Sequence, residues 1–211
     1  MSVRAVEKTS GWELEERLWE QGYAPVAGVD VGGRGTLAGP AVGAAVILPA
    51  GGPRFYDSKC LSPAQREQGE REIIECALAW GVGVAWLAEI EERNILGATH
   101  LAARRALRRL REQVVPGALL TDYLRLDEPE PVFPVARADS LSTQAAAAGI
   151  LAKVTRDRLM REMARCYPAY GFDSNKGYGS PAHLAALAEH GPSPLHRRTF
   201  APVRRTMEAG K

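Results

Sequence analysis

Short apolar runs bounded by glycine or proline recur along the chain, and this pattern predicts the strands of a sheet. The runs cover about residues 24–31, 39–50, 81–88, 117–124 and 131–136. The last run contains two prolines, which have no backbone N–H to donate to a neighbouring strand. We therefore expect that strand at an edge of the sheet.

Segments in which apolar residues recur at helical spacing lie around these runs. They predict helices over about residues 11–23, 62–80, 92–113, 141–166 and 180–190. Ser62 and Gln65 have the spacing of a capping box, and Pro63 suits the first helical position. Gly191 follows the last helix, as is typical of a helix end.

The order of these elements predicts the fold class. Two strands come first, and later strands alternate with helices, which indicates an α/β layered domain with a mixed sheet flanked by helices. We expect one domain over residues 11–205, between an N-terminal tail at 1–10 and a C-terminal tail at 206–211. Its helix-and-loop part, from about residue 167, should pack against the sheet.

Composition narrows the class of protein. The chain has 211 residues and a net charge of only +2, which suits one globular domain with a weak overall field. Basic clusters at 104–111 and 196–205 can meet phosphates or be solvated helix faces. Cys60, Cys76 and Cys166 lack the spacing of a disulfide framework or a zinc site. Without a signal peptide or a long apolar span, we expect a cytoplasmic protein with no membrane partner.

Three aspartates occupy comparable places at the ends of predicted elements. Asp30 closes the first strand, Asp122 closes the fourth, and Asp139 precedes the long helix. Strand ends converge in α/β sheets, so the carboxylates can cluster around a divalent cation, which prefers oxygen ligands. Alternatively, aspartates at strand ends serve turns, and Asp139 with Ser140 caps the helix.

Other chemistries lack their signatures. The chain has no GxSxG, CxxC, HExxH or phosphate-loop motif, and its four histidines lack the spacing of metal ligands. The glycines at 32–35 are followed by a strand pattern, whereas a dinucleotide-binding motif is followed by a helix.

Read together, several segments resemble the signature blocks of bacterial ribonuclease HII, the type 2 ribonuclease H. They are AGVDVGGRGTLAGP, DSKCLS, NILGAT, ILAKVTRDRLM, YPAYGFDSNKGYGS and HLAALAEHGPSPLHRRTFAPV, in order between about Val26 and Val203. The resemblance implies a ribonuclease H-like fold and a monomer. It also implies cleavage of RNA in RNA–DNA hybrids, and nicking of duplex DNA 5′ of a single ribonucleotide, with Mg²⁺ or Mn²⁺.

The resemblance also implies a catalytic site that this sequence matches in part. The family has four carboxylates, of which Asp30 matches the first, Asp122 the third and Asp139 the fourth. The second is a Glu, where this chain has Val31. Further departures from the family pattern are Thr36, Ala138, Gly149 and Asn175. We expect an active enzyme, and the alternative is a homologue that binds hybrids without efficient cleavage.

Substrate-binding residues follow from the same resemblance. The backbone of Gly33, Arg34 and Gly35 is expected to sense the 2′-hydroxyl of the ribonucleotide, together with Tyr178. We expect Lys59 to contact phosphate. Arg197 and Arg198 either contact phosphates or have a structural role inside the protein. The i,i+4 spacing of Lys153 and Asp157 predicts a structural ion pair.

Overall fold

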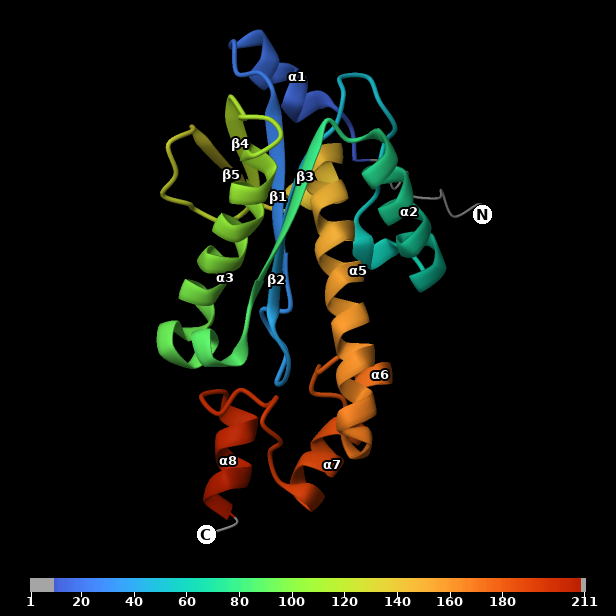
Figure 1. Ribbon diagram of the computed structural model, residues 1–211, viewed down its shortest axis with the longest axis vertical. Coiled ribbons are helices and arrows are strands. Elements are labelled where there is room, and N and C mark those ends of the chain that lie inside the picture. Colours follow the sequence, from blue (N-terminus) through green and yellow to red (C-terminus); the bar gives the residue numbers. More distant parts are fainter. Residues whose placement is uncertain (1–9, 210–211) are drawn as a thin grey trace, which may run out of the picture.

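The computed structural model describes residues 10–209 and contains one five-stranded mixed sheet (Figure 1). Its strands are β1 (Val26–Gly32), β2 (Ala41–Ile47), β3 (Ala79–Ala85), β4 (Ala118–Asp122) and β5 (Val132–Val135). Their order is β3-β2-β1-β4-β5. The first three pair antiparallel, while β4 runs parallel to β1 and β5 runs parallel to β4. The predicted α/β class is confirmed, and β5, with its prolines, is at an edge.

Eight α-helices are described within residues 10–209. They are α1 (Glu13–Glu20), α2 (Pro63–Cys76), α3 (Leu87–Arg111), α4 (Ala138–Leu141), α5 (Thr143–Cys166), α6 (Phe172–Asn175), α7 (Pro181–His190) and α8 (Ala201–Ala209). The capping box of Ser62 and Gln65 begins α2, as the sequence predicts. Helix α3 begins earlier than expected and kinks at Asn94, whose side chain accepts hydrogen bonds from the N–H groups of Leu96 and Gly97.

Helices α3 and α5 cover opposite faces of the sheet (Figure 1). Both helices pack close to the sheet because glycines of β1 and β2 face them. A Cβ at Gly28 would lie 2.1 Å from the backbone of Gln144 in α5, and one at Gly43 would lie 2.7 Å from Ala102 in α3. Along β1, Val29 and Val31 pack in the apolar cluster that includes residues of α3. Side chains alternate along a strand, so Asp30 points to the side of α5.

The C-terminal part lies beyond the ends of β1 and β2 (Figure 1). Its chain pairs with the connection between these strands, since Ala38 and His196 form a β-bridge and the Leu37 N–H donates to the carbonyl of Gly177. It also packs on α5 through Phe172 and Met160. The expectation that this part packs against the sheet is therefore wrong, because its contacts are with the glycine-rich connection and the end of α5.

The chain ends differ somewhat from the predicted tails. Helix α8 continues to Ala209, so residues 206–209 are helical. At the other end, residues 1–9 lie outside the described part, but Ser10 is buried and its hydroxyl donates a hydrogen bond to the carbonyl of Phe55. No helix among residues 10–209 combines the length and apolar character needed to cross a membrane.

Candidate active site

Asp30 lies on β1, two residues before the strand ends, and faces α5. Its Oδ1 accepts a hydrogen bond from the N–H of Val31 at 2.7 Å. On α5, Gly149 lies directly opposite, because a Cβ at that position would be 2.9 Å from Asp30 Oδ2. A small residue at 149 therefore leaves space for the Asp30 carboxylate.

Asp122 and Asp139 reach the same region from other elements. Asp122 closes β4, the parallel neighbour of β1, and its Oδ1 accepts from the N–H of Ala138 at 3.1 Å. Asp139 follows in α4 and is buried. The N-cap of α5 is Ser142, whose hydroxyl accepts from the N–H of Ala145. The alternative in which Asp139 and Ser140 cap the long helix is therefore wrong.

Burial and neighbouring carboxylates affect the protonation of Asp30 and Asp122. Burial, together with smaller contributions from the charges of Asp122 and Asp139, raises the pKa of Asp30 to about 6. Burial and the charge of Asp139 also raise the pKa of Asp122. Like charges held together in a partly buried site disfavour their ionised forms. The cluster therefore carries negative charge that a bound cation would stabilise.

Lys59 supplies one positive charge to this cluster. Its Nζ lies 2.5 Å from Asp139 Oδ2, although most of the lysine side chain is exposed. Burial alone would lower the pKa of the Lys59 ammonium, but the hydrogen bond and the charge of Asp139 outweigh it and the pKa is raised. Lys59 thus remains charged and neutralises part of the charge on Asp139.

The donor chemistry of this cluster fits a divalent cation. Carboxylate oxygens are the ligands that Mg²⁺ and Mn²⁺ prefer. However, residues 10–209 contain no set of three or more His, Cys, Asp or Glu side chains already arranged to hold an ion. One oxygen of Asp139 is engaged by Lys59. The metal cluster anticipated from the sequence therefore stays a prediction.

A cavity of about 260 Å³ brings most of the predicted site residues together. Its lining includes Asp30, Val31, Gly33, Arg34, Gly35, Lys59, Asp122, Lys153, Arg156 and Tyr178. Lys153 and Arg156 also line the cavity, although no motif in the sequence predicts them there. Their spacing from Gly149 on α5, four and seven residues, places all three on one helical face, and this face is the one opposite Asp30.

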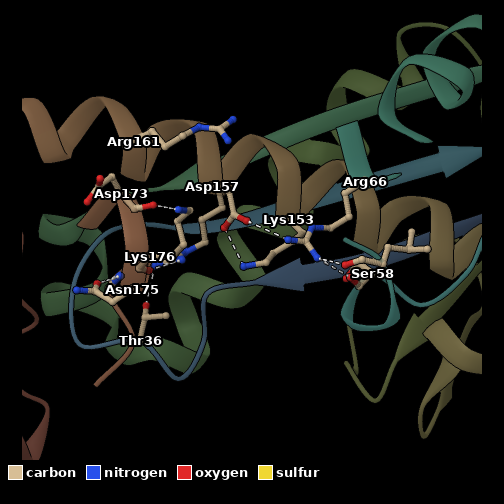
Figure 2. A network of polar contacts seen from close by, with 12 residues as sticks. Thr36, Ser58, Arg66, Lys153, Asp157, Arg161, Asp173, Asn175 and Lys176 are labelled. Atoms are coloured by element: carbon tan, nitrogen blue, oxygen red, sulfur yellow. Dashed lines mark hydrogen bonds and ion pairs between the residues drawn. The ribbon is translucent and has the colours of Figure 1, made fainter. Parts of the chain in front are cut away.

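Lys153 forms the predicted ion pair and also faces the cavity. Its Nζ donates to Asp157 Oδ1 at 2.8 Å, and Arg66 Nη2 lies 3.9 Å from Asp157 Oδ2 (Figure 2). The same Nζ is 5.6 Å from the centre of the Tyr178 ring, a cation–π distance. Asp157 therefore holds a lysine beside the tyrosine that we expect to contact substrate.

Arg197 is buried beneath the glycine-rich connection. Its guanidinium donates to the carbonyls of Gly33, Arg34 and Gly39 at 2.7–3.1 Å. Burial and the neighbouring charge of Arg156 lower the pKa of Arg197 to about 9. Of the two roles left open, the structural one fits Arg197, because its donors are directed at carbonyls. Arg198 is exposed, so its phosphate contact remains a prediction.

Arg156 supports the same connection from α5. It donates to the carbonyls of Pro40 and Ala38 and, at 2.9 Å, to the hydroxyl of Thr36. Gly33 has a φ of +84°, and a Cβ there would lie 2.2 Å from Arg156 Nε. Glycine is therefore required at 33 both for the backbone conformation and for the close packing of this arginine.

Thr36 and Asn175, two positions where the resemblance implies another residue, form hydrogen bonds within their own loops. The Thr36 hydroxyl donates to the Gly33 carbonyl at 3.1 Å, and Asn175 accepts from the N–H of Gly177 at 2.7 Å. Asn175 also donates to the carbonyl of Tyr170 at 2.7 Å. Both side chains thus hold the loops on either side of the cavity.

Val31 borders the cavity from the opposite side of β1. It is 9% exposed and belongs to the apolar cluster between the sheet and α3. Its side chain offers no oxygen to a cation, although its N–H orients Asp30. Val31 therefore adds an apolar side chain to the lining of the cavity.

Comparison with solved structures places the fold in a class. The ribonuclease H2 from Pyrococcus horikoshii OT3 is 27% identical, with a TM-score of 0.72, over 87% of this chain and 97% of that chain. The structure of Bst-RNase HIII in complex with Mn²⁺ is 20% identical, with a TM-score of 0.61, over 88% of this chain and 70% of that chain, which shows likeness of fold alone. The mixed sheet and the likeness to that ribonuclease H2 place this protein in the ribonuclease H-like fold class.

Sequence comparison identifies the family within that class. A family model described as Ribonuclease HII matches residues 27–203. A ribonuclease HII from Thermus thermophilus is 51% identical over 190 residues, which are 90% of this chain and 92% of that relative. The chain belongs to the ribonuclease HII family.

The raised pKa of Asp30 predicts a pH-dependent gain in stability for Asp30→Asn. The folded pKa, about 6, exceeds the ordinary value of 3.8, so ionisation costs the folded state stability as pH rises from about 4 to 6. Because the carboxylate borders an open cavity, we expect about 1–2 kcal/mol of added stability for Asn at pH 8. Most of the gain should vanish at pH 4.

Urea unfolding of both proteins in a metal chelator, at pH 8 and pH 4, measures this difference. Asn retains an oxygen that can accept from the N–H of Val31, so the local backbone contact is preserved. Asp127→Asn is the matched control, because Asp127 is exposed. A lower free energy of unfolding for Asp30→Asn than for the parent protein at pH 8 would contradict the prediction.

Proposed function

We propose that this protein is a metal-dependent endoribonuclease that acts on RNA–DNA hybrids and on duplex DNA containing single ribonucleotides. In the second case it nicks 5′ of the ribonucleotide and leaves a 3′-hydroxyl and a 5′-phosphate. The observation that carries this proposal is the cavity shared by Asp30, Asp122, the Gly33–Gly35 backbone and Tyr178. It combines an acidic centre, which suits phosphodiester hydrolysis, with a backbone surface that suits contact with a ribose.

Asp30, Asp122 and Asp139 would hold Mg²⁺ or Mn²⁺. When bound, such a cation supplies activation of water and stabilisation of the leaving oxygen. The complex of the fold relative Bst-RNase HIII with Mn²⁺ supports this choice of ion. Among the chain's own groups, Lys59 neutralises Asp139 and has an exposed side chain that can contact a phosphate oxygen.

Selection of a ribonucleotide would depend on the two walls of the cavity. Arg34 and Gly35 are exposed, and the carbonyls of Gly33 and Arg34 are engaged from below by Arg197. The backbone of this wall is therefore held in one conformation and is open to a ligand. Tyr178 is 46% exposed on the other wall, beside Lys153. A 2′-hydroxyl between these walls distinguishes RNA from DNA.

A cleavage assay on a DNA duplex with one embedded ribonucleotide tests the proposal. The comparison substrate is the same duplex made entirely of DNA, and each is incubated with Mg²⁺ and, separately, with Mn²⁺. We expect a single nick 5′ of the ribonucleotide and none in the DNA duplex. Tight binding of the ribonucleotide duplex without a nick in either metal would instead support the alternative, in which this protein is a homologue that binds hybrids without efficient cleavage.

Tyr178→Ala should reduce cleavage at a single ribonucleotide more than it reduces affinity for duplex DNA. Phosphate contacts supply most of the affinity, whereas the ribose contact supplies recognition. We expect kcat/KM at the ribonucleotide to fall about 10- to 100-fold, which corresponds to about 1.4–2.7 kcal/mol. Tyr178→Phe, which retains the ring, separates the hydroxyl from the stacking surface. Equal losses of cleavage and of all-DNA affinity would show that Tyr178 is only part of the scaffold.

A further inference from the structure

His183 and His196 form a buried pair on the far side of the cavity wall that carries Tyr178. His183 lies on α7, and His196 follows in the segment before α8. Both rings are essentially inaccessible, with exposed fractions of 0% and 1%. Their Nε2 atoms are 3.0 Å apart, so one nitrogen donates a proton to the other. The rings of Tyr170 and Phe172 pack around the pair.

The hydrogen-bond partners determine which nitrogens carry the protons. The N–H of Ser193 can only donate, and it is 3.0 Å from His196 Nδ1, so this nitrogen accepts. A neutral His196 therefore carries its proton on Nε2 and donates it to His183 Nε2. Neutral His183 in turn carries its proton on Nδ1, which lies 2.7 Å from the carbonyl of Tyr178.

Both imidazoles are neutral at physiological pH. Burial lowers the pKa of His183, and burial together with the adjacent His183 lowers the pKa of His196 to about 4. A proton added to His183 would place two N–H groups against each other at the short Nε2–Nε2 contact, and one added to His196 would place its Nδ1–H against the N–H of Ser193. The neutral pair thus forms one directed chain of hydrogen bonds from Ser193 to Tyr178.

This chain connects the two walls of the cavity. On one side it ends at the Tyr178 carbonyl, which also accepts from the N–H of Ser180 at 2.8 Å. On the other side, His196 lies in the segment that pairs with the glycine-rich connection. His196 bridges to Ala38, and the Arg197 N–H donates to the Leu37 carbonyl at 2.8 Å. The next side chain, Arg197, holds the carbonyls of Gly33 and Arg34.

We propose that His183 and His196 are positioning residues that hold Tyr178 at a fixed position relative to the Gly33–Gly35 backbone. Through this position they determine how well the protein distinguishes a ribonucleotide from a deoxyribonucleotide. Neither ring lines the cavity, so both act through the loops that they join. The inference rests on the proposed function in one respect, namely that Tyr178 and the glycine loop contact the ribose.

The test compares His183→Leu with His183→Asn. Leucine fills the space but donates no hydrogen bond, whereas the asparagine amide can still donate to the Tyr178 carbonyl. We expect His183→Leu to lower kcat/KM at a single ribonucleotide about 10²-fold, since a displacement of about 1 Å in a positioned group has effects of that size. His183→Asn should recover at least tenfold of this loss. His190→Leu, an exposed position on the same helix, should match the parent protein.

A double-mutant cycle separates positioning from general destabilisation. If His183 acts through Tyr178, His183→Leu should add little to the loss already caused by Tyr178→Ala. Affinity for the all-DNA duplex should change by less than about twofold, because phosphate contacts are untouched. Full additivity, or no recovery by asparagine, would overturn the proposal.

A measurement that needs no activity completes the test. In ¹⁵N NMR spectra at pH 7, the ring nitrogens should show a proton on Nδ1 of His183 and on Nε2 of His196. The ring resonances of Tyr178 should shift in His183→Leu and stay unchanged in His190→Leu. Other tautomers, or an unmoved Tyr178, would refute the pair's role. If the spectra show the expected tautomers and the expected shift of Tyr178, but the protein does not distinguish ribonucleotides from deoxyribonucleotides, the proposed function would be refuted instead.

Discussion

Asp122→Asn and Asp139→Asn should each lower the rate of nicking by about three orders of magnitude, or about 4 kcal/mol of transition-state stabilisation. Each change removes a negative charge and one strong oxygen donor, which weakens the hold on a cation and the activation of water together. Burial is the main cause of the raised pKa values of Asp30 and Asp122, and the charge of Asp139 raises both further. Loss of one should therefore affect the whole cluster.

Neither substitution should unfold the protein. Asparagine at 122 keeps an oxygen for the N–H of Ala138, and Lys59, the partner of Asp139, remains largely solvated when the ion pair is lost. Single-turnover nicking, a titration with Mg²⁺ or Mn²⁺, and thermal unfolding are measured on each variant. The exposed Asp127→Asn serves as the control for loss of a carboxylate outside the site. Near-parental nicking by either variant would remove that aspartate from the catalytic cluster.

Val31→Glu should raise the nicking rate about 10- to 100-fold and lower the metal concentration at half-maximal rate. Val31 lines the same cavity as Asp30, although its side chain lies on the other face of β1, so a carboxylate introduced there adds negative charge near the expected cation. If the site has one carboxylate fewer than the resemblance implies, the parent protein should need more metal, or should prefer Mn²⁺. The variant should reduce that requirement.

Val31→Gln provides the matched control, since it has the size of glutamate without its charge. Both variants lose packing of a side chain that is 9% exposed in an apolar cluster, and we expect each to cost about 1–3 kcal/mol of stability. A rise in rate with Glu but not with Gln would assign the effect to the carboxylate. If Val31→Glu folds and its rate stays unchanged in both metals, the suspects become the other departures, at Thr36, Ala138, Gly149 and Asn175.

Gly149 is the foremost of these suspects on structural grounds. A Cβ at this position would lie 2.9 Å from Asp30 Oδ2, so any larger residue would contact or displace the carboxylate. Thr36 and Asn175, by contrast, each complete hydrogen bonds of the loops in which they lie. The consequences of these departures should therefore differ, with Gly149 acting on the acidic cluster and the other two on the loop walls.

Local signals in the sequence determined most of the elements. Ser62, Pro63 and Gln65 defined the start of α2 because a capping box depends only on residues close in the chain. The prolines near 131–136 placed β5 at an edge because they cannot donate to a neighbouring strand. The long signature blocks also identified the family correctly. Each of these inferences needed only neighbouring residues or an ordered pattern along the chain.

The tertiary structure alone decided how the site is assembled. Asp30 and Asp122 are neighbours because β1 and β4 pair in parallel across about ninety residues of sequence, a contact that no local pattern encodes. Lys59 meets Asp139, Arg197 is buried under the glycine loop, and His183 meets His196 only after the strands, α5 and the C-terminal part have packed. Side chains such as these have no periodic or capping signature. Their roles follow from burial and from the partners that packing brings within hydrogen-bonding distance.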